Sequence, residues 1–333
     1  MPLIRRIARR RAAAQFDLVA GFVYSQILLA FTESGLLDAL AAAPRRTEEA
    51  SAISGLAPTA TDRLLRAAAA LDLAQMPQPG LWTLGEAGAA LSTNTGALAM
   101  IRHHHLLYAD LADPLALLRA DRGNETNLSA FWTYAAKDGS GSAAPYSELM
   151  AATQPMVSAE ILSVYDFAPH DRMLDIGGGS GRFCAAVGGA APNLALGIFD
   201  LPAVIAGASA APPHTMHHPG NFRTDPLPSG YDLMTLVRIL HDHDDDVVAG
   251  LLRSIYAALP PGGCLLIAEP MAENRHAPRM GDAYFGLYLW AMGSGRPRSE
   301  TALRHILQNA GFAQLRGISC AQPIIASMIV ATK

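Results

Sequence analysis

The stretch "RMLDIGGGSGRF", residues 172–183, places an apolar run, a glycine-rich turn and a helix-compatible segment one after another. A short apolar run that ends in glycine is typical of a buried strand. Glycine adopts positive φ and lets a ligand approach the backbone closely, so four glycines in one turn favour a ligand site over a plain connection. The stretch therefore predicts an α/β domain with a ligand bound where this strand meets its helix.

Further apolar segments of the same kind follow, and helical sequence separates most of them. They are "LALGIFD" (194–200), "YDLMTLVRIL" (231–240), "GGCLLIAEP" (262–270) and "IIASMIVATK" (324–333). Strands that alternate with helices are typical of a doubly wound, mostly parallel sheet. In such sheets ligands bind beyond the carboxyl ends of the strands, at the point where the strand order reverses.

The first 145 residues have a different texture, mostly helices broken by short polar turns. "TEEASAISGLAPTATDRLLRAAAALDLA" predicts helix, turn and helix, and "QMPQPGLWTLGEAGAAL" predicts two short extended pieces around a turn. This order indicates a winged helix in which the alanine-rich second helix packs against another helix. We therefore expect a helical dimerisation domain over residues 1–145 and the Rossmann-like sheet domain over 146–333.

Composition narrows the classes of partner. The net charge of −4 argues against nucleic acid, whose phosphates need clustered Lys and Arg. Three separated cysteines predict a reducing cytoplasm without disulfides or a cysteine metal site. The amino terminus carries five arginines, but the polar residues after them interrupt the apolar run, so we expect neither a cleaved signal nor a membrane span. These arginines are Arg5, Arg6, Arg9, Arg10 and Arg11.

Two acidic residues separate the candidate cofactors. Asp200 ends the next strand, where a carboxylate binds ribose hydroxyls of either a dinucleotide or S-adenosylmethionine. Asp175, directly before the glycines, would repel a pyrophosphate but attract the α-ammonium group of S-adenosylmethionine. The spacing G-x-G-x-G also departs from the dinucleotide pattern. The sequence therefore predicts S-adenosylmethionine and a methyltransferase.

The motifs "MLDIGGGSGRF", "IFDLPAVI", "PGNFRTDPLP", "LVRILHDHDDD", "LPPGGCLLIAEPM" and "AGF" resemble, in this order, the plant-type small-molecule O-methyltransferases. The resemblance covers nearly the whole chain and implies a homodimer. An amide at Asn221, where the family usually has aspartate, still hydrogen-bonds adenosine. The cofactor contacts that the motifs predict are Asp175, Gly177, Gly179, Asp200, Leu201, Asn221, Phe222, Arg238 and Asp242.

The cluster "RILHDHDDD", residues 238–246, holds the candidate base. His241 follows a strand at the carboxyl edge, and histidine accepts a proton near neutral pH. Glu269 ends the next strand and is placed to orient the imidazole; the resemblance implies the same two roles. Consecutive acids on a helix spread around its axis, so a metal is the weaker interpretation. We expect residues 243–246 to be a solvated helix start, which the helix dipole favours.

The acceptor is predicted to be apolar. Pro297 stands where many family members have a second glutamate beside the histidine, and "GDAYFGLYLWAMGSG" offers few polar groups. The pocket residues that we expect are Met271, Tyr284, Tyr288 and Met292.

Several segments, among them "HHHLLYADLADPLALLR", resemble the carotenoid branch of the family, which includes the hydroxyneurosporene and demethylspheroidene O-methyltransferases of purple bacteria. This implies methylation of the tertiary 1-hydroxyl of an acyclic carotenoid. It also implies a cytoplasmic enzyme with peripheral contact to the inner or photosynthetic membrane. The alternatives are a phenolic or polyketide acceptor, a bacteriochlorophyll-type C-methyltransferase and a winged-helix ligand-binding regulator.

Overall fold

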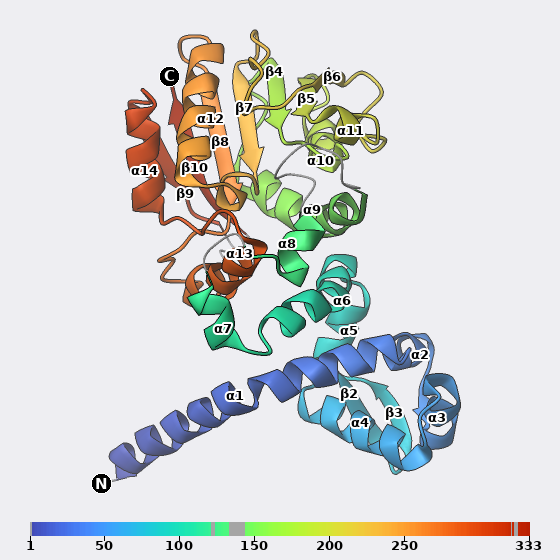
Figure 1. Cartoon of the computed structure of the whole chain (residues 1–333). Helices are drawn as coiled ribbons and strands as arrows, with labels where there is room; N and C mark the ends of the chain where they lie inside the picture. Colours follow the sequence, from blue (N-terminus) through green and yellow to red (C-terminus); the bar gives the residue numbers. More distant parts are fainter. Residues whose placement is uncertain (1, 121–123, 133–143, 321, 323–325) are drawn as a thin grey trace. The chain divides into compact units, whose positions relative to one another are not determined.

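The computed structural model describes residues 2–120, 124–132, 144–320, 322 and 326–333. The chain divides into two compact units, Met1–His104 and His105–Lys333, which Figure 1 shows in the colours of the sequence. Helix α6, Thr95–Asp110, runs across this division. The domain boundary that the sequence predicts after residue 145 stays a prediction.

The first unit contains the predicted winged helix. Strands β1, β3 and β2 form a small antiparallel sheet in that order, and Phe31, Leu65 and Trp82 are buried in its core. The elements are α1 (Pro2–Glu33), α2 (Leu36–Ala42), β1 (Arg45–Arg46), α3 (Thr47–Ser54), α4 (Pro58–Ala70), β2 (Ala74–Gln78), β3 (Leu81–Leu84) and α5 (Glu86–Ser92).

Helix α1 is unusually exposed for an apolar helix. The side chains of Phe16, Leu18 and Phe22 are 63%, 76% and 72% exposed. Judged by length and mean composition, Ile4–Glu33 is apolar enough to cross a membrane, a test that signal sequences and soluble core helices also pass. Large apolar side chains exposed together on one helix are typical of an interaction surface.

The second unit is built on a sheet in the order β6-β5-β4-β7-β8-β10-β9. Among the described strands, β10 pairs antiparallel with β8 and β9, and the other neighbours pair in parallel. The strands are β4 (Arg172–Ile176), β5 (Ala195–Asp200), β6 (Met216–Pro219), β7 (Leu233–Val237), β8 (Cys264–Glu269), β9 (Gln314–Ile318) and β10 (Ser327–Thr332). Strand order reverses at β4, which pairs with β5 on one side and β7 on the other. This is the predicted α/β architecture, and the reversal of strand order lies at the edge where we expect the ligand.

Helices cover both faces of this sheet (Figure 1). Helices α12 and α14 pack on one face, and α9 and α10 on the other, each over its own buried apolar cluster. The helices of this unit are α7 (Pro114–Arg119), α8 (Asn127–Trp132), α9 (Ala144–Val164), α10 (Arg182–Ala190), α11 (Pro202–Ile205), α12 (Asp245–Ala258), α13 (Gly286–Met292) and α14 (Glu300–Asn309), with a 3-10 turn η2 (Leu240–Asp242) and a π-helix η3 (Arg279–Phe285).

Candidate functional site

The glycine turn after β4 is shaped for close approach. Gly177 has φ 71°, a backbone conformation that residues with a side chain rarely adopt, and a Cβ there would have to displace Cδ1 of Ile239, which would lie 2.4 Å away. Gly179 has φ 56°, and a Cβ there would meet no atom within 4 Å. The turn is therefore packed against Ile239 at Gly177 and open at Gly179, which fits a ligand lying over Gly179.

Asp200 joins this turn to the next strand. Its Oδ2 accepts a hydrogen bond of 2.8 Å from Gly179 N, and its Oδ1 accepts one of 2.7 Å from Leu201 N. Burial raises the pKa of Asp200, and the two backbone N–H groups oppose that rise. The Asp200 carboxylate, at the end of β5, thus fixes the glycine turn through its hydrogen bond from Gly179 N.

Asp175 lies beneath the turn. It is 2% exposed, and its Oδ1 accepts a hydrogen bond of 2.6 Å from Thr235 Oγ1. Burial raises the pKa of Asp175 to about 7, although the Thr235 hydrogen bond lowers it. Its predicted contact with an α-ammonium group stays a prediction, because the described contact is with β7.

The loop after β6 carries Asn221 and Phe222. Asn221 Oδ1 accepts from Arg223 N at 3.0 Å, and Asn221 N donates to Asp225 Oδ2 at 2.8 Å. The Phe222 ring meets the His243 ring edge-on, with 5.2 Å between centroids. This loop therefore leans toward the turn that holds His241.

His241 and Glu269 meet as the sequence predicts. His241 is 5% exposed on the turn after β7; its backbone N donates to Glu269 Oε2 at 3.1 Å, and its Nδ1 lies 3.4 Å from the same oxygen. Its Nε2 lies 3.2 Å from Asp242 Oδ1. Burial lowers the pKa of His241, but Asp242 and Glu269 outweigh it, so the pKa is raised. Carboxylates on both sides suit an imidazole that gains a proton.

Arg238 is turned toward helix α9. Its φ is 58°, and its guanidinium donates to Thr153 Oγ1 at 2.6 Å and to the carbonyl of Met150 at 3.0 Å. A left-handed backbone at a non-glycine residue stores strain and is common near functional sites. Its predicted contact with the cofactor stays a prediction.

Three of the four predicted pocket residues gather around η3 and α13. Tyr288 and Met292 are 7% and 4% exposed and share an apolar cluster with Tyr284 packed against it. Burial raises the pKa of both tyrosines, so both remain protonated. Met271, 2% exposed, belongs to the buried cluster over α12 and α14, and its predicted pocket role stays a prediction. The ring of Phe285, on η3, stands edge-on to His241 at 5.6 Å.

Comparison with known proteins adds the family. Residues 108–313 match the O-methyltransferase domain and residues 16–94 the O-methyltransferase dimerisation domain. The chain belongs to the O-methyltransferase family. It is 43% identical to the demethylspheroidene O-methyltransferase of Rhodobacter capsulatus, over all of this chain and 85% of the relative, and 39% identical to that of Cereibacter sphaeroides, over all of this chain and 90% of the relative.

Solved structures share the fold at lower identity. Human N-acetylserotonin methyltransferase, in complex with SAM, has a TM-score of 0.81 at 23% identity, covering 97% of each chain. A calicheamicin-biosynthesis methyltransferase bound to SAH has a TM-score of 0.82 at 23% identity, covering 97% of this chain and 98% of that one. The family and the fold class predicted from the sequence are confirmed, and the match at residues 16–94 shows a dimerisation domain within the predicted region, whose extent to residue 145 stays a prediction.

One expectation for this O-methyltransferase is wrong in part. Asp244, Asp245 and Asp246 are exposed at the start of α12, but His243 is only 8% exposed. The guanidinium of Arg223 lies 3.2 Å from His243 Nδ1. Burial and this positive charge lower the pKa of His243 to about 3, so the ring is neutral. The sequence predicted a solvated helix start because His243 directly precedes three aspartates. Nothing in the local sequence indicated that Arg223, from another segment, would contact it.

Sequence reasoning also missed Arg298. This arginine is fully buried, and its guanidinium bonds to the segment that carries His241. Arginine is rarely buried, so residue type alone indicated a surface position. Among the described residues, no group of three or more His, Cys, Asp or Glu has the arrangement of a metal site.

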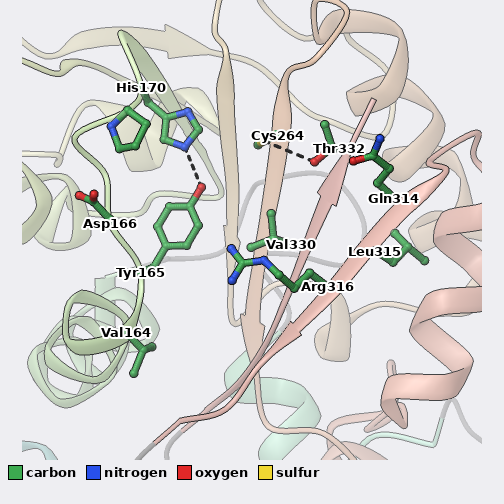
Figure 2. A pocket seen from close by; sticks show the side chains of 11 residues that line it. Val164, Tyr165, Asp166, His170, Cys264, Gln314, Leu315, Arg316, Val330 and Thr332 are labelled. Atoms are coloured by element: carbon green, nitrogen blue, oxygen red, sulfur yellow. Dashed lines mark hydrogen bonds between the residues drawn. The ribbon is translucent and has the colours of Figure 1, made fainter.

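A pocket of about 530 Å³ lies at the opposite, amino edge of the sheet (Figure 2). It includes Tyr165, His170 and Arg316; the Tyr165 hydroxyl lies 2.7 Å from His170 Nε2, and His170 Nδ1 lies 2.9 Å from Asp232. None of the predicted site residues lines it. The predicted site residues lie at the other edge.

Proposed function

We propose that this O-methyltransferase methylates the tertiary 1-hydroxyl of an acyclic carotenoid, with His241 as the general base. The observation that carries the proposal is the buried His241, held by Glu269 and set edge-on against Phe285 at the apolar η3–α13 segment. A base beside apolar rings suits an acceptor with one hydroxyl on a long hydrocarbon. The names of the two demethylspheroidene O-methyltransferase relatives support the same acceptor class.

The glycine turn fits the cofactor, S-adenosylmethionine. The turn is open at Gly179, where a Cβ would meet no atom within 4 Å, and Asp200 offers a carboxylate beside it for ribose hydroxyls. When bound, the cofactor supplies a methyl group on a positively charged sulfur. Aromatic and apolar residues of η3 and α13 exclude water from the acceptor side.

His241 accepts the proton of the acceptor hydroxyl. With Nδ1–H directed to Glu269, a neutral imidazole presents Nε2 as its proton acceptor. Asp242, 3.2 Å from Nε2, stabilises the imidazolium that forms. A tertiary alcohol is a weak acid, so we infer that proton removal accompanies attack of the oxygen. General base catalysis supplies about 10²–10⁴-fold, whereas alignment of the reacting atoms supplies about 7–11 kcal/mol. Positioning therefore contributes most of the rate.

We also propose peripheral membrane contact through the start of α1. Its five arginines precede residue 16, where the match to the dimerisation domain begins, and Ile4 and Ile7 beside them are 68% and 46% exposed. Basic and apolar side chains together bind an anionic membrane surface. This contact would bring a cytoplasmic enzyme to an acceptor that dissolves in the bilayer.

The acceptor is tested with labelled S-adenosylmethionine and two acceptors in detergent, 1-hydroxyneurosporene and caffeic acid. We expect label in the carotenoid alone. Label in the phenol alone would refute the acceptor while leaving the base assignment intact. A gel shift with DNA, run on the same preparation, tests the alternative of a winged-helix ligand-binding regulator. We expect no shift of the DNA.

A further inference from the structure

A buried arginine is bonded to the turn that carries His241. The Arg298 side chain is fully buried; its Nη1 donates to the carbonyl of Leu240 at 2.7 Å, and its Nη2 donates to the carbonyl of His243 at 2.7 Å. Its Nε and Nη2 donate to Asp245 Oδ1 at 2.9 Å and 2.7 Å. The bonded carbonyls flank His241 and Asp242 in the chain, so one planar group spans the turn.

Two neighbours of Arg298 hold the same segment. Ser294 Oγ donates to the carbonyl of Asp242 at 2.9 Å, and Gly295 N donates to Asp244 Oδ1 at 3.0 Å. A Cβ at Gly295 would lie 2.1 Å from the His241 carbonyl oxygen, so the two backbones are in direct contact. We call Ser294, Gly295 and Arg298 the clamp.

The chemistry of these contacts is specific to arginine. Burying a positive charge is costly unless it is paired and its N–H groups are satisfied. Here the carboxylate of Asp245 pairs with the charge of Arg298, and the carbonyls of Leu240 and His243 accept hydrogen bonds from its Nη1 and Nη2. Lysine has a compact ammonium group and does not reproduce this planar geometry. A residue needed only to fill space would not require such a costly group.

We propose that Arg298 is a positioning residue for the methyl transfer, which holds the His241 turn in the geometry that the base requires. The inference rests on the proposed role of His241. Glu269 holds the imidazole and its backbone N from the core, and the clamp holds the carbonyls on the other side of the turn. A misplacement of about 1 Å in a catalytic group lowers the rate by as much as about 10²-fold.

The test compares Arg298→Lys with Arg296→Lys. Arg296 also binds Asp245, but it is 47% exposed and makes no bond to the turn among the contacts described. We expect Arg298→Lys to lower kcat about 10–100-fold, with the Kd for S-adenosylmethionine within about threefold of wild type because the glycine turn is untouched. Arg296→Lys keeps wild-type kcat. A folded Arg298→Lys enzyme with wild-type kcat, or with kcat and cofactor affinity lost together, would overturn the proposal.

A double variant shows whether Arg298 acts through His241. If it does, adding Arg298→Lys to His241→Ala lowers kcat no further, whereas a general structural defect multiplies the losses. If His241→Ala alone has wild-type activity, the proposed base is wrong, a result distinct from failure of the clamp. The pKa of the His241 imidazole, measured by NMR, tests the same idea without an activity assay. We expect this pKa to move toward 6.5 in Arg298→Lys, because the ring moves away from the carboxylates of Asp242 and Glu269. An unchanged pKa would contradict the proposal.

Should Arg298→Lys fail to fold, Asp245→Asn carries the same test. It weakens the partner of Arg298 while leaving the guanidinium in place, and Asp246→Asn is its control because both acids lie in the first turn of α12. We expect Asp245→Asn to lower kcat about 3–10-fold, since a charged hydrogen bond becomes a neutral one. Equal kcat in the two variants would refute the clamp.

Discussion

Replacing Glu269 by glutamine tests the electrostatic part of the site most directly. Glu269 is fully buried, and its Oε2 accepts from His241 N at 3.1 Å and lies 3.4 Å from Nδ1. Its Oε1 is buried without a hydrogen-bond partner among the described residues, so the contacts described for this carboxylate are those that Oε2 makes with His241. Glutamine preserves the shape and removes the charge. The variant therefore isolates what that charge does for the imidazole.

The magnitude follows from these contacts. Hydrogen bonds to a charged group contribute about 1.5–3 kcal/mol, and one pKa unit corresponds to about 1.4 kcal/mol. We therefore expect Glu269→Gln to lower the pKa of His241, because the imidazolium loses a carboxylate that stabilises it, and to lower kcat by about 10–100-fold. Because His241 must be neutral to accept a proton, the acid limb of the kcat/KM profile moves to lower pH.

The assay is methyl transfer from labelled cofactor over pH 5 to 9. Glu160→Gln is a matched control, because Glu160 is also buried and accepts a backbone N–H, from Gln322 at 2.8 Å, but does not contact His241. The control keeps the wild-type pH profile. A Glu269→Gln enzyme with an unmoved acid limb would refute the reasoning, whatever its kcat.

Four further predictions concern other parts of the molecule. His241→Ala lowers kcat by about 10²–10⁴-fold and leaves measurable turnover; complete loss with cofactor binding intact contradicts this. Gly177→Ala weakens S-adenosylmethionine binding by more than about tenfold in calorimetry, since alanine is strained at φ 71° and its Cβ displaces the Ile239 side chain, whereas Gly189→Ala, whose Cβ meets nothing within 4 Å, does not. The pKa of Asp175 is raised from 3.8 to about 7 in the folded protein, so the fold favours the protonated carboxyl. The resulting contribution to the free energy of unfolding is fully present below about pH 4 and is lost as the pH rises through 7. Urea unfolding at pH 5 and 8 should show this loss in the wild type and not in Asp175→Asn; equal pH dependence in the two proteins argues against it. Deleting residues 1–11 abolishes flotation with anionic liposomes but leaves the dimer intact, and unchanged flotation removes the membrane proposal.

The candidate site was predictable where its residues follow strand ends. Gly177, Asp200, His241 and Glu269 each stand just past or at the end of a parallel strand, and such ends meet at one edge of a sheet. Local pattern and one rule of topology are therefore sufficient to bring them together. The pocket role predicted for Met271 stays a prediction; its side chain belongs to the buried cluster over α12.

By itself, the sequence determined the order of strands and helices, the glycine turn and the pairing of a histidine with a glutamate, because these depend on short-range periodicity and residue chemistry. Only the tertiary structure decided which charged groups are buried. Arg298 lies under the His241 turn, His243 is neutral beside Arg223, and Arg238 reaches α9. The partners come from distant segments, and burial reverses the surface preference of a charged residue only when those partners converge on it.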